Sequence, residues 1–381
     1  MMSVYFDHNS TTRLAEPALE AMLPFLQEQY GNASSRHDLG TAAREAINQS
    51  REKVASLVGV QASQVIFTSG GTESNNMFIN GMTSYLPPGK ILIGAIEHPC
   101  VVVPSRHLAR LGWSLDMIPV SADGVIQVNS ISTNALAKDC LVSVMAANNE
   151  TGVKQPISLL AAQVRNGGGW MHTDAIQAVG KMPISFSDSG VHAMSLSAHK
   201  IYGPKGIGAL IVDKKLPIDA FIRGGGHESG LRSGTENVAS IVGFGAAAEL
   251  AVEIARNYDA RVGFLRDRIE SELTGLGAVI HGYRSPRLAN TSYFSIPGIQ
   301  GETLVMELNK SGFAVASGSA CSSHGSDLSA TLKAMGVSEE LAHGAVRLSL
   351  GLGNTIEECE KFNADLKVIV SRLKGLVSLT V

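Results

Sequence analysis

An apolar strand that ends in a lysine and a glycine-rich turn lies near the middle of the chain. Val191 to Leu196 alternate small and apolar side chains as a buried strand does, and Gly203-Pro204 with Gly206 ends the pattern. Lys200 is therefore expected at a strand end. Apolar surroundings favour the uncharged amine, which can form a Schiff base with a carbonyl group. A surface lysine after a strand remains the alternative on this segment alone.

Two polar side chains come just before this lysine. Ser197 and His199 are two residues apart, so a strand would place them on one side and Lys200 on the other. This arrangement predicts that Ser197 and His199 bind the phosphate of a cofactor while Lys200 holds its aldehyde.

Length and composition limit the classes of protein to consider. A chain of 381 residues can form two domains, and 44% hydrophobic residues with 40 glycines suit an α/β enzyme. The net charge of −3 argues against a surface for nucleic acid. The sequence does not open on a basic region followed by an apolar core, and no uninterrupted apolar run reaches membrane-spanning length. We therefore expect a cytoplasmic protein with no nucleic-acid or membrane partner.

The four cysteines are Cys100, Cys140, Cys321 and Cys359, and they form no Cys-x-x-Cys pair. Their spacing indicates neither a disulfide framework nor a structural zinc site, and no metal is expected. Cys321 lies in a run of Gly, Ser and Ala, which favours a thiolate nucleophile on a moving loop over a small buried core residue. The other three fall in helix or strand patterns and are predicted to be core residues.

A glycine turn joins a strand to a helix early in the chain. The strand pattern Gln64 to Thr68 leads into Ser69-Gly70-Gly71-Thr72-Glu73 and then into an apolar helix pattern. Backbone N–H groups at a helix N-terminus suit a phosphate, which approaches closely because glycine has no side chain. The Walker and dinucleotide-binding spacings are both absent. The turn is a candidate phosphate site, and an ordinary strand-to-helix turn is the alternative.

Polar residues also follow three other strand patterns. They are Glu97-His98-Pro99, Asn148 to Gly152, and Asp174. Open α/β sheets bind ligands at this carboxyl edge. A buried aspartate there needs a cationic partner, which a protonated pyridine nitrogen would provide, whereas a lone histidine such as His98 is more often structural. Asp174 and Lys200 together are typical of a pyridoxal-phosphate enzyme of the aspartate-aminotransferase type.

Five segments resemble those of the class V pyridoxal-phosphate enzymes, specifically the cysteine desulfurases of the NifS/IscS type. They are Thr68 to Asn76, Glu97-His98-Pro99, Asn148 to Gly152, His172 to Gln177 and Ser197 to Lys200, and the resemblance extends from Tyr5 to about Leu376. It implies an α/β, aspartate-aminotransferase-like fold (fold type I), in which a large domain with a mixed, mostly parallel sheet carries a smaller α/β C-terminal domain. Residues 16–256 are expected to form the large cofactor-binding domain. Residues 1–15 and 257–381 are expected to form the small domain with the mobile cysteine loop.

The resemblance also implies roles for single residues. Lys200 corresponds to the lysine that binds pyridoxal 5'-phosphate, Asp174 to the partner of the pyridine nitrogen, and His98 to the residue stacked on the ring. Asn149 and Gln177 correspond to the residues that contact the ring oxygen. The residues that correspond to the phosphate ligands are Gly71, Thr72, Ser197, His199 and Thr235. In the family this threonine reaches the site of the neighbouring subunit, so a homodimer with shared active sites is implied.

Substrate-binding residues are implied in the same way. Arg347 lies in His343 to Gly351, which resembles the segment whose arginine clamps the substrate carboxylate, and a surface salt bridge is the alternative. Asn32 lies in a loop near the substrate, in which Ala33 replaces the usual proline. Asn75 replaces a common aspartate, and the chain ends at Val381 without the longer tail of the housekeeping type.

The implied reaction converts L-cysteine into L-alanine and leaves sulfur on Cys321 as a persulfide, with His98 assisting the proton transfers. The sulfur would pass to a protein acceptor, an iron–sulfur scaffold or a sulfur carrier, which the sequence does not identify. A selenocysteine lyase or another class V lyase or aminotransferase that does not need Cys321 is the second interpretation. A catalytically silent binding module on the same fold is the third, and the intact set of Lys200, Asp174 and Cys321 argues against it.

Overall fold

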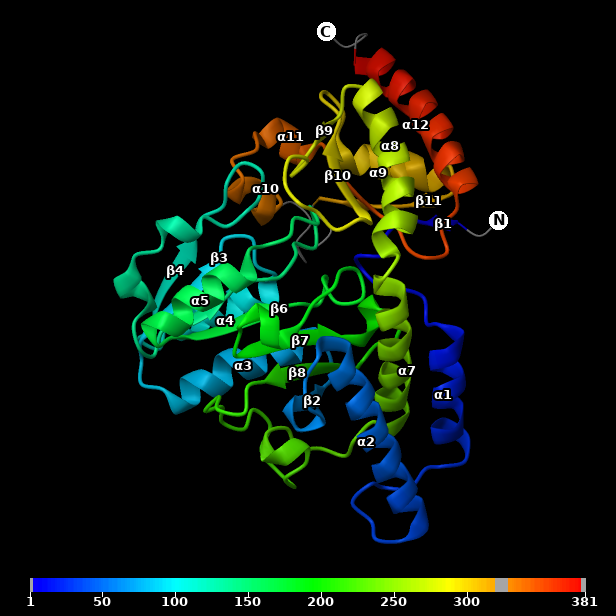
Figure 1. Ribbon diagram of the computed structural model, residues 1–381. Helices are drawn as coiled ribbons and strands as arrows, with labels where there is room; N and C mark the ends of the chain where they lie inside the picture. Colours follow the sequence, from blue (N-terminus) through cyan, green and yellow to red (C-terminus); the bar gives the residue numbers. More distant parts are fainter. Residues whose placement is uncertain (1–2, 319–327, 378–381) are drawn as a thin grey trace.

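A seven-stranded sheet forms the centre of the computed structural model, which describes residues 3–318 and 328–377 (Figure 1). The strand order is β2 (Val65–Thr68), β8 (Gly208–Val212), β7 (Ala193–Ser197), β6 (Trp170–Asp174), β5 (Leu141–Ser143), β3 (Lys90–Gly94) and β4 (Ser114–Ile118). Strand β8 is antiparallel to both of its neighbours, and the other adjacent pairs are parallel. The predicted mixed, mostly parallel sheet is confirmed.

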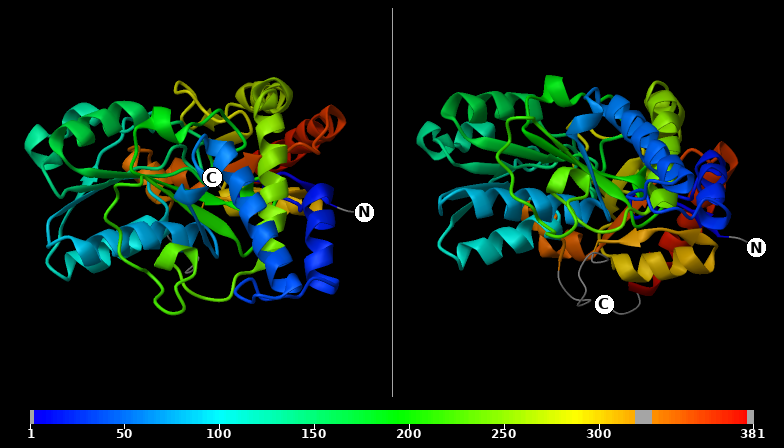
Figure 2. Two further views of the ribbon diagram at one scale, coloured as in Figure 1. Left: turned by 60° about the horizontal axis from the view of Figure 1, so that its bottom comes forward. Right: turned by 90° about the horizontal axis from the view of Figure 1, so that it is seen from below.

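Helices cover both faces of this sheet, as Figure 2 shows. Helices α3 (Gly71–Tyr85) and α4 (Pro99–Ala109) lie on one face, and α5 (Ile157–Gly167) lies on the other. The side chains of β3 alternate between two apolar clusters, because Ile91 and Ile93 pack with the α3 and α4 residues while Leu92 joins the cluster that contains α5. Burial on both faces explains why these strands are apolar throughout.

Three helices pack together at one end of the sheet. They are α1 (Glu16–Gln27), α2 (Asp38–Val58) and α7 (Val238–Ala255), and the short α6 (Phe186–Ser189) lies between β6 and β7 in the sequence. Among the helices of the described residues, only α7 is long and apolar enough to cross a membrane by length and composition. Half of that stretch is buried inside the protein, as in a core helix.

The C-terminal part forms a second, smaller sheet. Its antiparallel order is β12 (Ala316–Ser317), β13 (Ala345–Ser349), β10 (Thr291–Ser295) and β9 (Val279–Ile280). The helices of this part are α8 (Phe264–Gly275), α9 (Gly301–Lys310), α10 (Ala330–Ala334), α11 (Glu339–His343) and α12 (Ile356–Val377). A smaller α/β unit is thus present where the sequence predicts it.

The N-terminus belongs to this smaller unit. Strand β1 (Val4–Tyr5) pairs in parallel with β11 (Phe313–Ala314). Phe6 is fully buried, and its ring lies 5.9 Å from that of Phe313 and 5.5 Å from that of Phe362. This packing places residues 4–6 with the C-terminal part, and the predicted domain bounds, 1–15 with 257–381 and 16–256, stay predictions.

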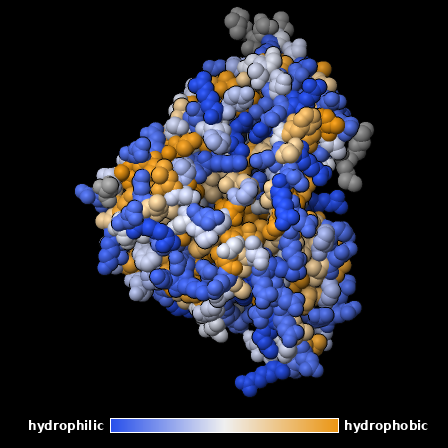
Figure 3. Space-filling view, viewed as in Figure 1, coloured by the Kyte–Doolittle hydropathy of each residue, from blue (hydrophilic) through white to orange (hydrophobic). Residues whose placement is uncertain are grey.

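The surface is not uniformly polar. On the face drawn in Figure 3, hydrophilic residues predominate along the edges, and hydrophobic residues gather on the left and near the centre. At the end of α1, Leu26 is 61% exposed and Tyr30 is 80% exposed. Large apolar side chains exposed in this way are candidates for a protein interface.

Candidate active site

A pocket of about 320 Å³ lies where the carboxyl ends of the central strands meet the smaller unit. Ten of the residues predicted from the sequence line it: Gly71, Thr72, His98, Asn149, Asp174, Gln177, Ser197, His199, Lys200 and Arg347. They come from segments far apart in the chain, and the parallel strands bring them to one edge of the sheet.

Lys200 lies three residues beyond the end of β7. Its amine donates hydrogen bonds to the backbone carbonyls of Asn9 at 2.5 Å and Ser10 at 2.6 Å. The chain leaves the strand at Ser197, and Ala198–Lys200 forms a 3₁₀ turn. The prediction that a strand places Ser197 and His199 on one side and Lys200 on the other was therefore wrong, because residues 198–200 are not in a strand. All three side chains nevertheless line the pocket.

Asp174 ends β6 and is 6% exposed. Its Oδ1 accepts a hydrogen bond from the Ile176 backbone N–H at 3.0 Å, and its Oδ2 accepts one from Asn75 Nδ2 at 2.7 Å. Burial raises the pKa of this carboxyl, while those two hydrogen bonds and the charges of His98 and Lys200 act in the opposite direction. A cation beside Asp174 would balance the negative charge of its carboxylate.

His98 caps the N-terminus of α4. Its Nδ1 accepts a hydrogen bond from the backbone N–H of Cys100 at 3.2 Å, and Pro99 occupies the first helical position. Burial lowers the pKa of the imidazole, against the charge of Asp174, which raises it. The cap thus fixes a neutral imidazole at the pocket wall.

The other end of the pocket suits an anion. Gly71 and Thr72 begin α3, a helix of 15 residues, and Ser197 and His199 face the same space. A Cβ atom at Gly71 would lie 2.0 Å from Ile176 Cδ1, so the helix start and the β6 turn are in close contact. Burial and, secondarily, Lys200 lower the pKa of His199 to about 4. A carboxylate at one end, an anion cradle at the other and an amine between them define the pocket.

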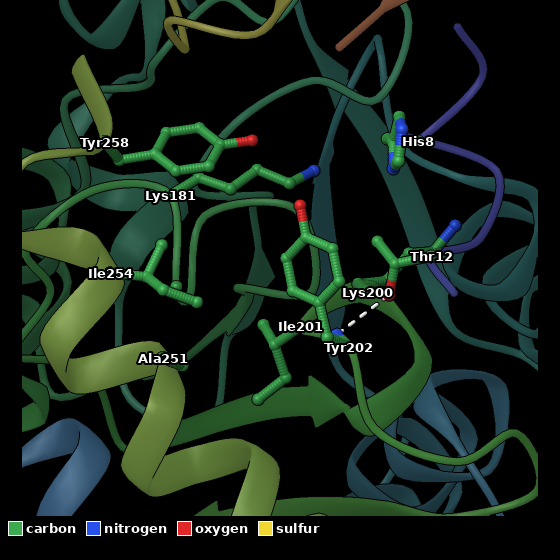
Figure 4. Close-up of a pocket in the computed structure, with 10 residues that line it drawn as sticks. His8, Thr12, Lys181, Lys200, Ile201, Tyr202, Ala251, Ile254 and Tyr258 are labelled. Atoms are coloured by element: carbon green, nitrogen blue, oxygen red, sulfur yellow. Dashed lines mark hydrogen bonds between the residues drawn. The ribbon is translucent and has the colours of Figure 1, made fainter. Parts of the chain in front are cut away.

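A second lysine lies behind Lys200. Lys181 is 4% exposed, and its amine donates to Gln177 Oε1 at 2.6 Å and to Asn9 Oδ1 at 3.0 Å. It lines a cavity of about 10 Å³. In Figure 4 the hydroxyl groups of Tyr202 and Tyr258 point toward its amine. Burial lowers the pKa of Lys181 well below its usual value. Lys181 could not be identified from the sequence, because a lysine in a turn is usually exposed.

Asn9 connects these groups and was also missed, since its segment is a polar turn in the sequence. Its carbonyl oxygen accepts hydrogen bonds from Lys200 and, at 2.9 Å, from Gln177 Nε2. Its Nδ2 donates to the Asn149 carbonyl at 3.1 Å and to Thr291 Oγ1 at 2.9 Å. Asn9 is 1% exposed. Through these hydrogen bonds it connects the N-terminal segment to β10 and to residues that follow β6 and β7.

Arg347 reaches the pocket from β13. Its guanidinium donates to Asp7 Oδ1 and Ser10 Oγ, both at 2.7 Å, and to the Asn149 carbonyl at 3.2 Å. Arg347 does form a salt bridge, with Asp7, but its own side chain is only 5% exposed, so the pair is not a plain surface one, and the substrate-binding role of Arg347 stays a prediction. A buried guanidinium beside the pocket is suited to a carboxylate.

Two of the predicted residues, Asn32 and Thr235, do not line this pocket. Asn32 is exposed between α1 and α2, where its Oδ1 accepts a hydrogen bond from the Ser34 N–H at 2.8 Å. Thr235 is exposed and lines a separate pocket beside Gly206. Cys321 lies outside the described residues. The roles of all three stay predictions.

Comparisons with known proteins agree with one another. Residues 4–362 match the family described as aminotransferase class-V. Cysteine desulfurase IscS of Dictyoglomus turgidum is 41% identical over 98% of this chain and 96% of its own. A solved NifS-like protein is 38% identical, with a TM-score of 0.91 over 97% of this chain and 100% of that one. A structure of SspA in complex with cysteine is 30% identical, with a TM-score of 0.81 over 91% and 98% of the two chains.

Proposed function

The chain belongs to the class-V aminotransferase family, and from this premise we propose that it is a cysteine desulfurase that converts L-cysteine into L-alanine. The observation that carries the proposal is the convergence of Lys200, Asp174 and Arg347 on one pocket. An amine, a buried carboxylate and a guanidinium are what an amino-acid substrate and a pyridine cofactor require.

The cofactor in this proposal is pyridoxal 5'-phosphate, and the donor set fits it. The start of α3 with Thr72, Ser197 and His199 would hold the phosphate, and Asp174 would hold the pyridine nitrogen. Asn149 and Gln177 lie in the same pocket and would contact the ring oxygen. When bound, the cofactor supplies an aldehyde for Lys200 and a ring that accepts electrons.

The chain's own groups would then carry the proton transfers. The Lys200 amine removes the α-proton of cysteine, which requires it to leave the carbonyls of Asn9 and Ser10. Arg347 binds the substrate carboxylate, and His98, at the pocket wall, assists the proton transfers. The ionised Asp174 holds its partner nitrogen in the protonated state.

Cys321 is proposed as the sulfur acceptor within the enzyme. Its thiolate attacks the substrate sulfur, the carbon–sulfur bond breaks, and the electron pair left on carbon takes up a proton. L-Cysteine and the Cys321 thiol together give L-alanine and a Cys321 persulfide, so the step balances without an external oxidant. Delivery to an iron–sulfur scaffold or another sulfur carrier would follow.

A homodimer is part of the proposal. Thr235 and Asn32 are exposed and do not line the pocket of their own chain, and exposed Leu26 and Tyr30 lie near the same loop. A partner chain that brings Thr235 to the phosphate end would supply the threonine that the family uses there. A cytoplasmic location is also proposed, with support from the free, buried state of Cys100, Cys140 and Cys359.

The test is to incubate the cofactor-loaded protein with L-cysteine in the absence of reductant. We expect L-alanine to accumulate, and the mass of the peptide that contains Cys321 to increase by one sulfur atom. Lys200→Ala should abolish both products, because no other amine occupies its position.

The two products separate the alternatives. Alanine with an unmodified Cys321 peptide would indicate a lyase that releases sulfide or selenide directly. The absence of alanine would contradict the desulfurase and leave the silent binding module.

A further inference from the structure

A buried thiol contacts the imidazole at the pocket wall. Cys100 is 8% exposed, lines the pocket, and lies on the first turn of α4. Its Sγ is 2.9 Å from His98 Nδ1, and Asn75 Nδ2 donates to the same Sγ at 3.0 Å. The sequence assigned Cys100 to the core, which its burial confirms, but this contact gives it a second role.

The donors and acceptors in this cluster fix the position of each proton. Asp174 Oδ2 is an acceptor, so it faces the amide nitrogen of Asn75 and not its oxygen. The second N–H of that amide donates to Cys100 Sγ. The backbone N–H of Cys100 can only donate, and it points at His98 Nδ1. Nδ1 therefore carries no proton, and the thiol must donate to it.

We propose that Cys100 is a positioning residue for His98: its thiol donates a second hydrogen bond to Nδ1, beside that of the Cys100 backbone N–H, and so stabilises the neutral imidazole with its proton on Nε2. Asn75 completes a chain of hydrogen bonds that runs from Asp174 to His98. The importance of this tautomer for catalysis rests on the proposed function, in which His98 transfers protons. The tautomer itself does not depend on it.

Burial keeps this sulfur in the thiol form. It raises the pKa of Cys100 to about 12, the charge of Asp174 acts in the same direction, and the hydrogen bond from Asn75 acts against them. A thiol with such a pKa is a poor nucleophile at neutral pH. Cys100 is thus a hydrogen-bond donor in this pocket, a different task from that proposed for Cys321.

The matched pair of variants is Cys100→Ser and Cys100→Ala. Both are smaller than cysteine and leave a similar space, but only serine keeps a donor for Nδ1 and an acceptor for Asn75. Cys140→Ala is the control, because Cys140 is also buried but precedes β5, at the opposite edge of the sheet from the pocket. His98→Gln identifies the His98 signal.

The measurement is nitrogen NMR of the full-length, cofactor-loaded protein labelled at histidine, followed through a pH titration. We expect the wild type, Cys100→Ser and Cys140→Ala to show His98 with Nδ1 unprotonated. In Cys100→Ala the midpoint of the His98 titration should rise by about one pH unit, because the neutral imidazole loses a donor. The acidic limb of the pH profile of kcat should move with it.

Two results would overturn the proposal. One is a proton on Nδ1 of His98 in the wild type, which needs no variant to detect. The other is a Cys100→Ser protein that titrates like Cys100→Ala. A wild-type protein that forms no alanine from L-cysteine but shows His98 with Nδ1 unprotonated would contradict the proposed function and leave this inference standing.

Discussion

His172 is a buried histidine whose protonation is coupled to folding. It is 0% exposed, its two ring nitrogens lie 2.9 Å from Ser143 Oγ and 2.8 Å from Ser195 Oγ, and its ring stacks on Phe78. Burial lowers its pKa from 6.5 to about 3. The folded protein therefore holds this imidazole neutral at pH values where the unfolded chain protonates it.

This difference predicts a loss of stability in acid. Between a pH of about 6.5 and about 3, the unfolded chain binds a proton at His172 that the folded protein does not. As the pH is lowered through this range, His172 therefore reduces the free energy of unfolding by up to about 1.4 kcal/mol per pH unit. Urea unfolding at about pH 7 and about pH 5 measures the decrease. In His172→Gln the decrease should be smaller, although the variant is less stable at both pH values, and an equal decrease would contradict the assignment.

Single residues could be predicted where their chemistry is visible in the local sequence. Lys200 and Asp174 follow strand patterns, and the motif around Arg347 marked it before its burial was known. Cys100 and Lys181 could not be predicted in this way. Their roles depend on which groups face them in space, and neither a helix pattern nor a turn specifies those neighbours.

At the scale of elements, the start of α3 is fitted against the turn after β6. A methyl group at Gly71 would lie 2.0 Å from Ile176 Cδ1 and 3.0 Å from its Cγ1. In Gly71→Ala the side chain of Ile176 has to move, and because Ile176 lines the pocket we expect it to turn toward the cofactor's place. We expect the affinity for pyridoxal phosphate to fall by about tenfold, as overpacking usually costs 1–3 kcal/mol.

A compensating change tests this explanation. Ile176→Ala removes the atoms that Gly71→Ala would strike, so the double variant should bind the cofactor as tightly as Ile176→Ala alone. Absorbance titration with the cofactor gives both affinities. If the double variant stayed as weak as Gly71→Ala, the contact with Ile176 would not be the cause.

Most elements of the large unit could be predicted from periodicity, because its strands are short apolar runs that end at polar residues. The pattern predicts a helix from Glu16 to Gln27, which matches α1, and a strand from Lys90 to Ala95, one residue longer than β3. The turn Ala198–Lys200 was treated as strand, since hydrogen bonding beyond Ser197 is not visible in the pattern. Strands β1 and β11 have two residues each, which is too short for an alternating pattern. Their pairing could therefore not be predicted from the sequence.

At the scale of the whole molecule, the dimer makes a prediction about mixed subunits. Neither Lys200→Ala nor Thr235→Ala should form a complete site with a copy of itself. If Thr235 serves the neighbouring chain, a mixed dimer has one site with both residues intact. Mixing equal amounts under exchange conditions should restore about a quarter of the wild-type sites, because about half of the dimers are mixed and each has one complete site.

The measurement is alanine formation at limiting cofactor concentration, with light scattering to confirm the dimer. Recovery above the sum of the two separate variants supports shared sites. No recovery would place Thr235 in the site of its own chain or in none, and a monomer in solution would contradict the dimer directly.

The acceptors of the Lys200 amine come from residues that can reach their places only late in synthesis. Asn9 and Ser10 follow β1, whose partner β11 is made about 300 residues later. During translation the large unit can fold as soon as it emerges, with Lys200 in place and this part of its surroundings missing. Asn9 and Ser10 are thus made well before they can settle, and this part of the site is completed only after β11 has been made.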